Sequence, residues 1–198
     1  MLGDSHILQL QANKYEDMSV IDIGANIGNH GLFAAAFLSA ARVIPFEPNP
    51  KALKLLLANI SANGLVAKYD LSHLGKGLGA APSAGFGMEA RDRNLGAAKM
   101  LPDEGDIEIT TGDLALEGDQ PDFIKIDVEG MEIDVLSGLT ETISRTRPNL
   151  CVEVNDENSG AMAAWIKANA YRQVDEYRRY RRSENVFLCP AEQEHAGA

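Results

Sequence analysis

The feature that most constrains the fold is a short apolar segment that runs into a glycine-containing turn and then into a second apolar segment. In VIDIGANIGNHG, residues 20–31, the apolar residues at 20–23 predict a buried strand, and Gly24 and Gly28 predict a tight turn. The apolar residues at 32–38 predict a helix. Glycine lacks the Cβ that would hold a ligand away from the backbone N–H groups at a helix N-terminus, so this pattern favours a bound anionic group at the turn.

The spacing of the glycines narrows the class of ligand. Dinucleotide-binding turns read G-x-G-x-x-G, and their second glycine lets the backbone approach a pyrophosphate. In this chain Asn26 and Asn29 stand where the second and third glycines would be. The turn therefore disfavours a pyrophosphate, and with it a nicotinamide cofactor.

Acidic residues on both sides of the turn favour a different nucleoside. Asp22 precedes by two residues a G-x-x-x-G turn formed by Gly24, Asn26 and Gly28, and this turn led by an acid suits a ligand that carries an ammonium group and a small carboxylate. A second predicted strand, residues 43–46, ends at Glu47, where an acid can accept hydrogen bonds from both ribose hydroxyls. S-adenosylmethionine carries all of these groups, so we expect it as the cofactor.

Strands and helices are predicted to alternate along most of the chain. Asn49 can cap a helix that begins at Pro50 and ends at Gly64, and a third strand is predicted near residues 66–71. The later predicted elements are strands at 123–126 and 150–154, a helix between them, a helix at 161–169 and two C-terminal strands. This order predicts a single α/β domain, residues 1–198, in which a mainly parallel sheet has helices on both faces.

Residues 75–105 interrupt this alternation. The segment is rich in glycine and alanine and shows no sustained hydrophobic period. Such a stretch inside a compact domain often serves as a functional lid, so we predict a lid over the substrate, with Asn94 and Gly96 as its candidate functional positions.

A second acidic segment, DFIKIDVEGMEIDVLSG at residues 122–138, supplies the candidate catalytic residues. Its strand delivers Asp127 and Glu129 to the carboxyl edge of the sheet, where open α/β folds bind ligands. Acids at this edge can orient a substrate hydroxyl and accept its proton. Side chains alternate along a strand, so Lys125 shares a side with Asp127, and we expect the two to pair because a buried unpaired lysine is costly.

Two further acids follow this segment. Glu132 falls in the first turn of the next helix, where the helix dipole by itself accounts for a negative charge. Glu153 interrupts the apolar strand at 150–154 and therefore needs a polar partner. Asp127, Glu153 and Asn155 carry oxygen atoms of the kind that Mg²⁺ binds, but their spacing does not require a metal, and no metal site is predicted.

The composition disfavours several classes of partner. The chain has 18 Lys and Arg against 29 Asp and Glu, and its net charge of −11 repels nucleic-acid backbones and anionic membranes. Cys151 and Cys189 are too few for a disulfide scaffold. The N-terminus lacks a signal-peptide pattern, and no apolar run is long enough for a membrane span. We therefore expect a cytoplasmic protein with no membrane or nucleic-acid partner, whose oligomeric state the sequence does not predict.

In combination, these motifs resemble the FkbM family of S-adenosylmethionine-dependent methyltransferases. The resemblance rests on VIDIGANIGNHG, VIPFEPNPKALKLLLANISANG, DFIKIDVEGMEIDVLSG and PNLCVEV, which span most of residues 20–154. Its most distinctive part is the K-x-D-x-E-G-x-E run from Lys125 to Glu132. The resemblance implies a Rossmann-like class I methyltransferase fold with a seven-stranded sheet whose last strand is antiparallel. It also implies O-methylation, commonly of a hydroxyl on a natural product or sugar.

The candidate site thus contains two groups of residues. Asp127 or Glu129 is the expected base or hydroxyl-orienting group, Glu153 its helper, and Lys125 a charge that tunes it. The predicted cofactor-binding residues are Asp22, Gly24, Ala25, Asn26, Gly28, Glu47, Asn49 and Asp127. Two other interpretations stay open, a nicotinamide-dependent oxidoreductase and a catalytically silent cofactor-binding module whose acidic surface meets a basic partner.

Overall fold

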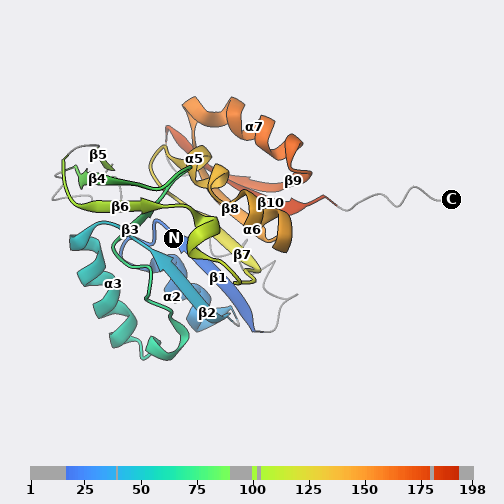
Figure 1. Ribbon diagram of the computed structural model, residues 1–198. Helices are drawn as coiled ribbons and strands as arrows, with labels where there is room; N and C mark the ends of the chain where they lie inside the picture. Colours follow the sequence, from blue (N-terminus) through green and yellow to red (C-terminus); the bar gives the residue numbers. More distant parts are fainter. Residues whose placement is uncertain (1–16, 39, 90–99, 102–103, 179–180, 192–198) are drawn as a thin grey trace.

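The protein is built around a six-stranded sheet with the strand order β2-β1-β7-β8-β10-β9 (Figure 1). The structure, a computed structural model, describes residues 17–38, 40–89, 100–101, 104–178 and 181–191. The strands of this sheet are β1 (Met18–Ile23), β2 (Ala40–Phe46), β7 (Phe123–Ile126), β8 (Asn149–Asn155), β9 (Tyr171–Tyr177) and β10 (Ser183–Pro190).

The pairing within this sheet brings the carboxyl ends of four strands to one edge. β1 pairs in parallel with β2 on one side and with β7 on the other, and β7 pairs in parallel with β8. β10 is antiparallel to both of its neighbours, β8 and β9. The Rossmann-like α/β fold expected from the sequence is confirmed, and the glycine turn after β1 lies at the same edge as the acids after β2 and β7.

The sheet differs from the sequence-based expectation in its strand count. Residues 66–71 were expected to form a strand, but they contain the 3₁₀ helix η1 (Val66–Lys68), and Tyr69 makes only an isolated parallel bridge to Val43. The side chain of Asp70 accepts hydrogen bonds from Arg42 and from the backbone N–H of Ser72, which curls the chain away after one bridge. The main sheet therefore has six strands in the described part of the chain, where the family resemblance implied seven.

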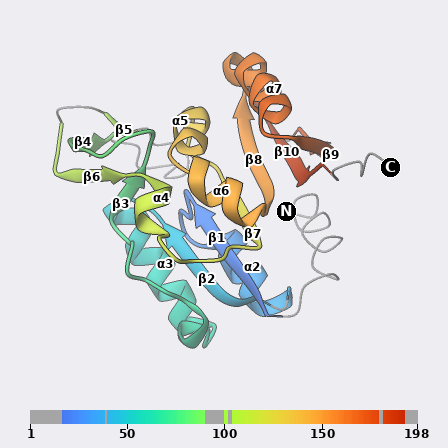
Figure 2. The ribbon, with the colours of Figure 1, turned by 45° about the vertical axis from the view of Figure 1, so that its right-hand side comes forward.

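Helices cover both faces of the main sheet, as expected. α2 (Asn29–Phe37) packs on one face, where Leu32 at its start contacts α3 (Pro50–Ala62), whereas the later helices pack on the other face. The later helices are α4 (Gly112–Ala115), α5 (Glu132–Ser137), α6 (Thr140–Thr146) and α7 (Ser159–Ala168). Figure 2 shows α5 and α6 in front of the sheet and α2 behind it. Asn49 caps α3 by accepting from Lys51 N at 3.0 Å, which confirms the predicted start of that helix.

The single helix predicted between β7 and β8 is divided. α5 ends at its C-cap Gly138, and α6 begins directly after Leu139. A Cβ on Gly138 would lie 2.1 Å from the carbonyl oxygen of Gly79, so the junction is in close contact with the chain after β3. The helix breaks where this second layer of chain packs against it.

That second layer is a four-stranded sheet which the sequence analysis did not predict. Its order is β3-β6-β4-β5, with β3 (Lys76–Leu78) parallel to β6 (Ile107–Thr110). β4 (Ser83–Met88) is antiparallel to both β6 and β5 (Met100–Leu101). Much of the predicted lid therefore belongs to a sheet, while Asn94 and Gly96 lie outside the described residues.

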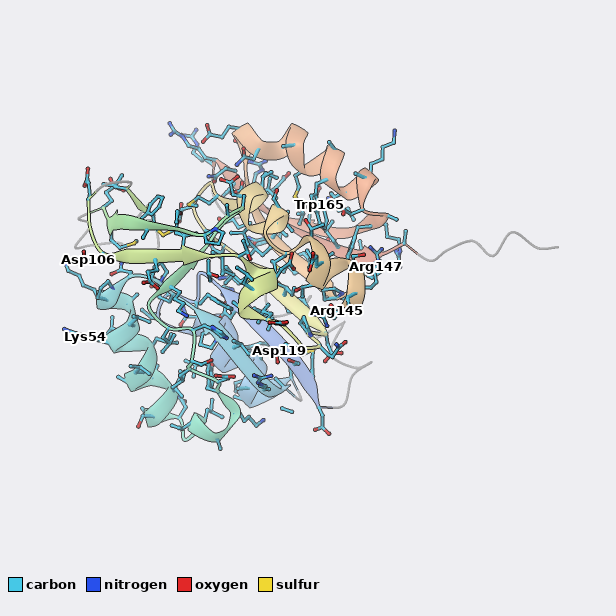
Figure 3. All side chains as sticks on the ribbon, in the orientation of Figure 1. Lys54, Asp106, Asp119, Arg145, Arg147 and Trp165 are labelled. Carbon is cyan, nitrogen blue, oxygen red and sulfur yellow. The ribbon has the colours of Figure 1, made fainter. Side chains whose placement is uncertain are left out.

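Arginines at the end of α6 fix the opposite edge of the main sheet. Arg147 donates to the carbonyl oxygens of Asn169 and Ala170, and its guanidinium carbon lies 4.4 Å from the centroid of the Tyr171 ring. Arg145 donates to the carbonyl oxygen of Asp119 at 2.6 Å. Figure 3 labels both arginines, on the side where β7, β8 and β9 begin.

Among the described residues, no helix combines the length and hydrophobicity needed to cross a membrane.

Candidate active site

A pocket of about 640 Å³, open to solvent, lies at the carboxyl edge of β1, β2 and β7. The second sheet forms one of its walls. The lining residues are Ile23, Gly24, Asn26, Phe46, Glu47, Pro48, Lys76, Gly77, Leu78, Met88, Met100, Asp127, Val128 and Glu129.

The turn after β1 brings the backbone close to the neighbouring strand. Gly24 has a φ of +72°, and a Cβ at this position would lie 1.8 Å from the carbonyl oxygen of Asp127. The N–H groups of Gly24 and Ala25 both donate to Phe46 O, at 2.9 and 3.0 Å, so the turn is tied to the end of β2. Only glycine fits at position 24 because any Cβ would push apart the ends of β1 and β7.

Glu47 is held in place at the end of β2. Its carboxylate is 6% exposed, and its two oxygens accept from Asn26 N at 2.7 Å and from Asn49 N at 2.8 Å. Burial raises the pKa of Glu47 above its ordinary value, against the effect of these two N–H groups. Each carboxylate oxygen has a second lone pair, so a carboxylate fixed in this way can still accept two ligand hydroxyls.

Asn26 lines the same pocket. Its backbone has a φ of +51°, and its side-chain Oδ1 is buried without a hydrogen-bond partner among the described residues. A buried polar atom without a partner is uncommon in folded proteins, and a ligand is one of the groups that can satisfy it.

A buried lysine joins the glycine turn to the acid after β7. Lys125 Nζ donates to Gly24 O at 3.0 Å and lies 3.4 Å from both Asp22 Oδ1 and Asp127 Oδ2. Burial disfavours its charge, but the two carboxylates outweigh burial and raise the pKa of Lys125 above its ordinary value. The expected pairing with Asp127 is confirmed, and Lys125 is a fixed cation.

Asp22 was expected to contact the cofactor, but it lies behind the glycine turn and outside the pocket. Its carboxylate is 1% exposed, accepts from Gly31 N at 3.0 Å near the start of α2, and does not line the pocket. Ala25 packs in the core with Leu56, and a Cβ on Gly28 would lie 2.5 Å from Leu56 Cδ1. Asp22, Ala25 and Gly28 therefore hold the turn in place through contacts outside the pocket.

The predicted residues thus fall into two sets. Of the predicted cofactor-binding residues, Gly24, Asn26, Glu47 and Asp127 line the pocket, whereas Asp22, Ala25, Gly28 and Asn49 support it from outside. Asn49 does so by donating its N–H to Glu47 and capping α3 with its side chain.

Asp127 and Glu153 form a coupled pair of acids. Burial opposes the ionisation of Asp127, but Lys125, a hydrogen bond from Glu153 and the nearby His30 lower the pKa of Asp127 below its ordinary value. Burial, and then the hydrogen bond and charge of Asp127, raise the pKa of Glu153 to about 8, although Ser183 Oγ donates to Glu153 Oε1 at 2.6 Å. At neutral pH the pair therefore holds one proton, on Glu153, and Asp127 is the ionised member.

The turn after Asp127 carries the two remaining acids of the motif. Glu129 lines the pocket and has a φ of +52°, followed by Gly130 at +106°. Glu132 is fully buried, and its Oε1 accepts from Asn155 N at 2.8 Å and from Asn158 Nδ2 at 2.9 Å. The helix dipole alone does not explain Glu132, because its carboxylate joins the turn after β7 to the turn after β8.

Several residues of the site were not predicted from the sequence. His30, in the first turn of α2, faces the same buried space as Asp22 and Lys125. Lys76, Met88 and Met100 line the pocket from the second sheet. The histidine next to the glycine turn was a usable signal, whereas the lysine and the methionines carried none because nothing predicted the strands that place them.

Comparison with known proteins identifies the family. A model of the methyltransferase FkbM domain matches residues 22–173. The chain belongs to the FkbM methyltransferase domain family. Hexuronic acid methyltransferase AglP of Haloferax volcanii is 30% identical over 150 residues, which are 71% of this chain and 58% of that protein. The chain therefore spans little more than half the length of this curated relative.

Solved structures share the fold. The methyltransferase FkbM from Methylobacillus flagellatus superposes with a TM-score of 0.60 at 20% identity, over 88% of this chain and 44% of that one. An rRNA methylase from Streptococcus thermophilus gives a TM-score of 0.58 at 14% identity, over 94% of this chain and 95% of that one. At these identities the likeness shows the fold alone, and this fold occurs in proteins named for very different acceptors.

Proposed function

We propose that this protein transfers a methyl group from S-adenosylmethionine to a hydroxyl of a small molecule. The observation that carries the proposal is the buried carboxylate of Glu47, which lines the pocket and is held there by two backbone N–H groups. Membership of the FkbM methyltransferase domain family supports it. The name of the Haloferax relative supports a sugar-type acceptor.

The pocket fits this cofactor in three respects. Glu47 can accept from the two ribose hydroxyls, and the partly exposed Met88, Met100 and Val128 offer apolar surface for a purine. The unpartnered Asn26 Oδ1 can accept from an ammonium group. Three acids line the pocket against one lysine, Lys76, which favours a cationic ligand over the pyrophosphate of a nicotinamide cofactor.

When bound, the cofactor supplies a methyl carbon activated by its sulfonium. The chain then has to align the acceptor oxygen with that carbon and take up one proton. Good alignment can lower the barrier by about 7–11 kcal/mol, and a positioned base adds about 10²- to 10⁴-fold. Both tasks fall to residues at the carboxyl edge.

Asp127 suits the role of the base. Its side chain is 28% exposed, lines the pocket and is ionised, so its carboxylate can accept the proton of a hydroxyl held against it. Lys125, a permanent cation, holds that carboxylate through an ion pair and is not itself a base. Glu153, held by Ser183, is the protonated partner that donates to Asp127.

Cofactor binding is the first test. S-adenosylhomocysteine at ~100 times its dissociation constant should stabilise the protein by about 2.7 kcal/mol, while NAD⁺ should leave the melting temperature unchanged. Glu47→Gln should weaken binding of S-adenosylhomocysteine at least ~10-fold in isothermal titration calorimetry, because hydrogen bonds to charged groups contribute about 1.5–3 kcal/mol. The exposed Glu141→Gln is the matched control. Unchanged affinity in the Glu47 variant would contradict the proposed binding mode.

A further inference from the structure

We propose that Asp127 and Glu153 share a proton that the protein releases when S-adenosylmethionine binds and keeps when S-adenosylhomocysteine binds. The inference rests on the proposed function, because it takes the pocket at the carboxyl edge to hold these two molecules. It adds a way in which the chain distinguishes the cationic methyl donor from the neutral product. It assigns this distinction to Glu153, which contacts Asp127 but does not line the pocket.

The register of two parallel strands brings the two acids together. Ile126 on β7 pairs with Val152 on β8, so the residues that follow them, Asp127 and Glu153, are neighbours across the two strands. Their side chains are hydrogen-bonded to each other. An ionised carboxylate can only accept hydrogen bonds, so this contact requires a proton between the two carboxyls. The proton therefore follows from the contact itself and belongs to the pair.

The contacts of the pair do not neutralise a second negative charge. Lys125 Nζ lies 3.4 Å from Asp127 Oδ2 and also 3.4 Å from Asp22 Oδ1, so its single charge already serves two carboxylates. Ser183 Oγ donates to Glu153 Oε1 at 2.6 Å, and a hydroxyl can donate in the same way to an ionised carboxylate. These contacts give an ionised Glu153 a hydrogen-bond donor but no countercharge.

The surrounding charges place the loss of this proton close to neutral pH. Burial, Asp127 and Glu129 raise the pKa of Glu153 to about 8. Burial opposes the ionisation of Asp127, but Lys125 and His30 on α2 help to lower its pKa below the ordinary value. A charge that enters the pocket can therefore change the protonation of the pair near neutral pH.

The two ligands differ in charge at a single atom. The sulfur of S-adenosylmethionine carries a methyl group and a positive charge, whereas the sulfur of S-adenosylhomocysteine carries neither. Asp127 lines the pocket, so a cation bound there favours the doubly ionised form of the pair. An opposite charge nearby lowers the pKa of a carboxyl by about 1 to 3. The pair thus loses its proton to solvent beside the donor and keeps it beside the product.

The same proton completes the balance of the proposed reaction. The acceptor oxygen gains a methyl group and loses its proton, while the electron pair of the broken S–C bond stays on sulfur. Asp127 and Glu153, doubly ionised beside the donor, take up this proton as the positive charge disappears. The pair then returns to the protonation state that it has with S-adenosylhomocysteine bound.

Calorimetry can count the released protons. The enthalpy of binding is measured at about pH 7.5 in buffers that differ in ionisation enthalpy, for both ligands, with the wild type and with Glu153→Gln. Glutamine keeps the hydrogen bonds to Ser183 and Asp127 but has no proton to lose, while His30 and the titrating groups of the ligand are common to both proteins. With S-adenosylmethionine the wild type should release about half a proton more than the variant, the value for a pKa of about 8 that falls by about 1. With S-adenosylhomocysteine the two proteins should release equal numbers.

A control variant and a direct measurement support this count. Glu157→Gln removes an exposed acid in the 3₁₀ helix η3 (Asp156–Asn158) that follows β8, and it should release as many protons as the wild type. The direct measurement uses wild-type protein with ¹³C-labelled glutamate carboxyls. The resonance that titrates near pH 8 should move toward its ionised position when S-adenosylmethionine binds at about pH 7.5, and stay in place when S-adenosylhomocysteine binds.

The ways in which the test can fail are distinguishable. If neither ligand binds, the proposed function itself fails. If both bind and the wild type releases no more protons than Glu153→Gln with S-adenosylmethionine, or if the carboxyl resonance does not move, this inference alone is wrong. An excess release that is as large with S-adenosylhomocysteine as with S-adenosylmethionine would also overturn it, because the positive charge on sulfur would then play no part.

Discussion

At the scale of single residues, the site depends on acids that share one edge but have different surroundings. Asp127 is ionised beside Lys125, Glu153 is protonated beside Asp127, and Glu47 is fixed by backbone N–H groups. The three carboxyls therefore differ in protonation and in freedom to move, because burial and neighbouring charges set which carboxyl keeps its proton.

Replacing Asp127 should separate chemistry from cofactor binding. Asp127→Asn keeps the shape but removes the base, so turnover with an acceptor identified by screening should fall about 10²- to 10⁴-fold. The affinity for S-adenosylhomocysteine, measured by calorimetry, should change less than about threefold. The exposed Asp134→Asn on α5 is the matched control. A large loss of cofactor affinity would instead make Asp127 a cofactor ligand.

The pKa of Glu153 predicts how the stability of the protein depends on pH. In the unfolded chain this carboxyl titrates near 4.5, and in the folded state near 8, so the folded state binds the extra proton between these values. Its contribution to stability is therefore complete below about pH 4.5 and is lost as the pH rises through about 8. Burial raises this pKa most, Asp127 and Glu129 raise it further, and the hydrogen bond from Ser183 lowers it.

Glu153→Gln should remove that dependence. Glutamine can accept from Ser183 and donate to Asp127, so it mimics the protonated acid at every pH. Urea midpoints measured from pH 6 to pH 9 should fall more steeply in the wild type than in this variant, and Glu157→Gln should behave like the wild type. Parallel profiles for the wild type and Glu153→Gln would show that Glu153 does not hold the proton.

At the scale of elements, the glycine turn after β1 packs against the end of β7. This contact predicts how much a substitution at Gly24 destabilises the fold. Gly24→Ala should be destabilising because a Cβ would lie 1.8 Å from Asp127 O in addition to a φ of +72°. Gly64→Ala is the control, since Gly64 has a φ of +68° and an added Cβ there would have no atom within 4 Å. The control should cost about 1–2 kcal/mol of unfolding free energy, and Gly24→Ala clearly more. Equal losses in urea denaturation would refute the contact.

The same elements show what the sequence could predict. The turn, α3 and the strand before Asp127 were predictable because each follows from a local period, a cap or a glycine. The second sheet was not, since its strands are short, contain glycine and pair across residues far apart in the chain. The role of Glu132 was missed for a related reason, because its partners Asn155 and Asn158 lie on another element.

At the scale of the whole molecule, net charge and pocket charge have the same sign. The chain carries −11, and Glu47, Asp127 and Glu129 line the pocket at the carboxyl edge of the sheet. An RNA acceptor would have to place phosphates against this field, although an rRNA methylase shares the fold. We therefore predict that tRNA and rRNA fragments show no binding below ~10 µM in mobility-shift assays at about 0.15 M salt. Tight binding that weakens steeply as salt increases would contradict this prediction.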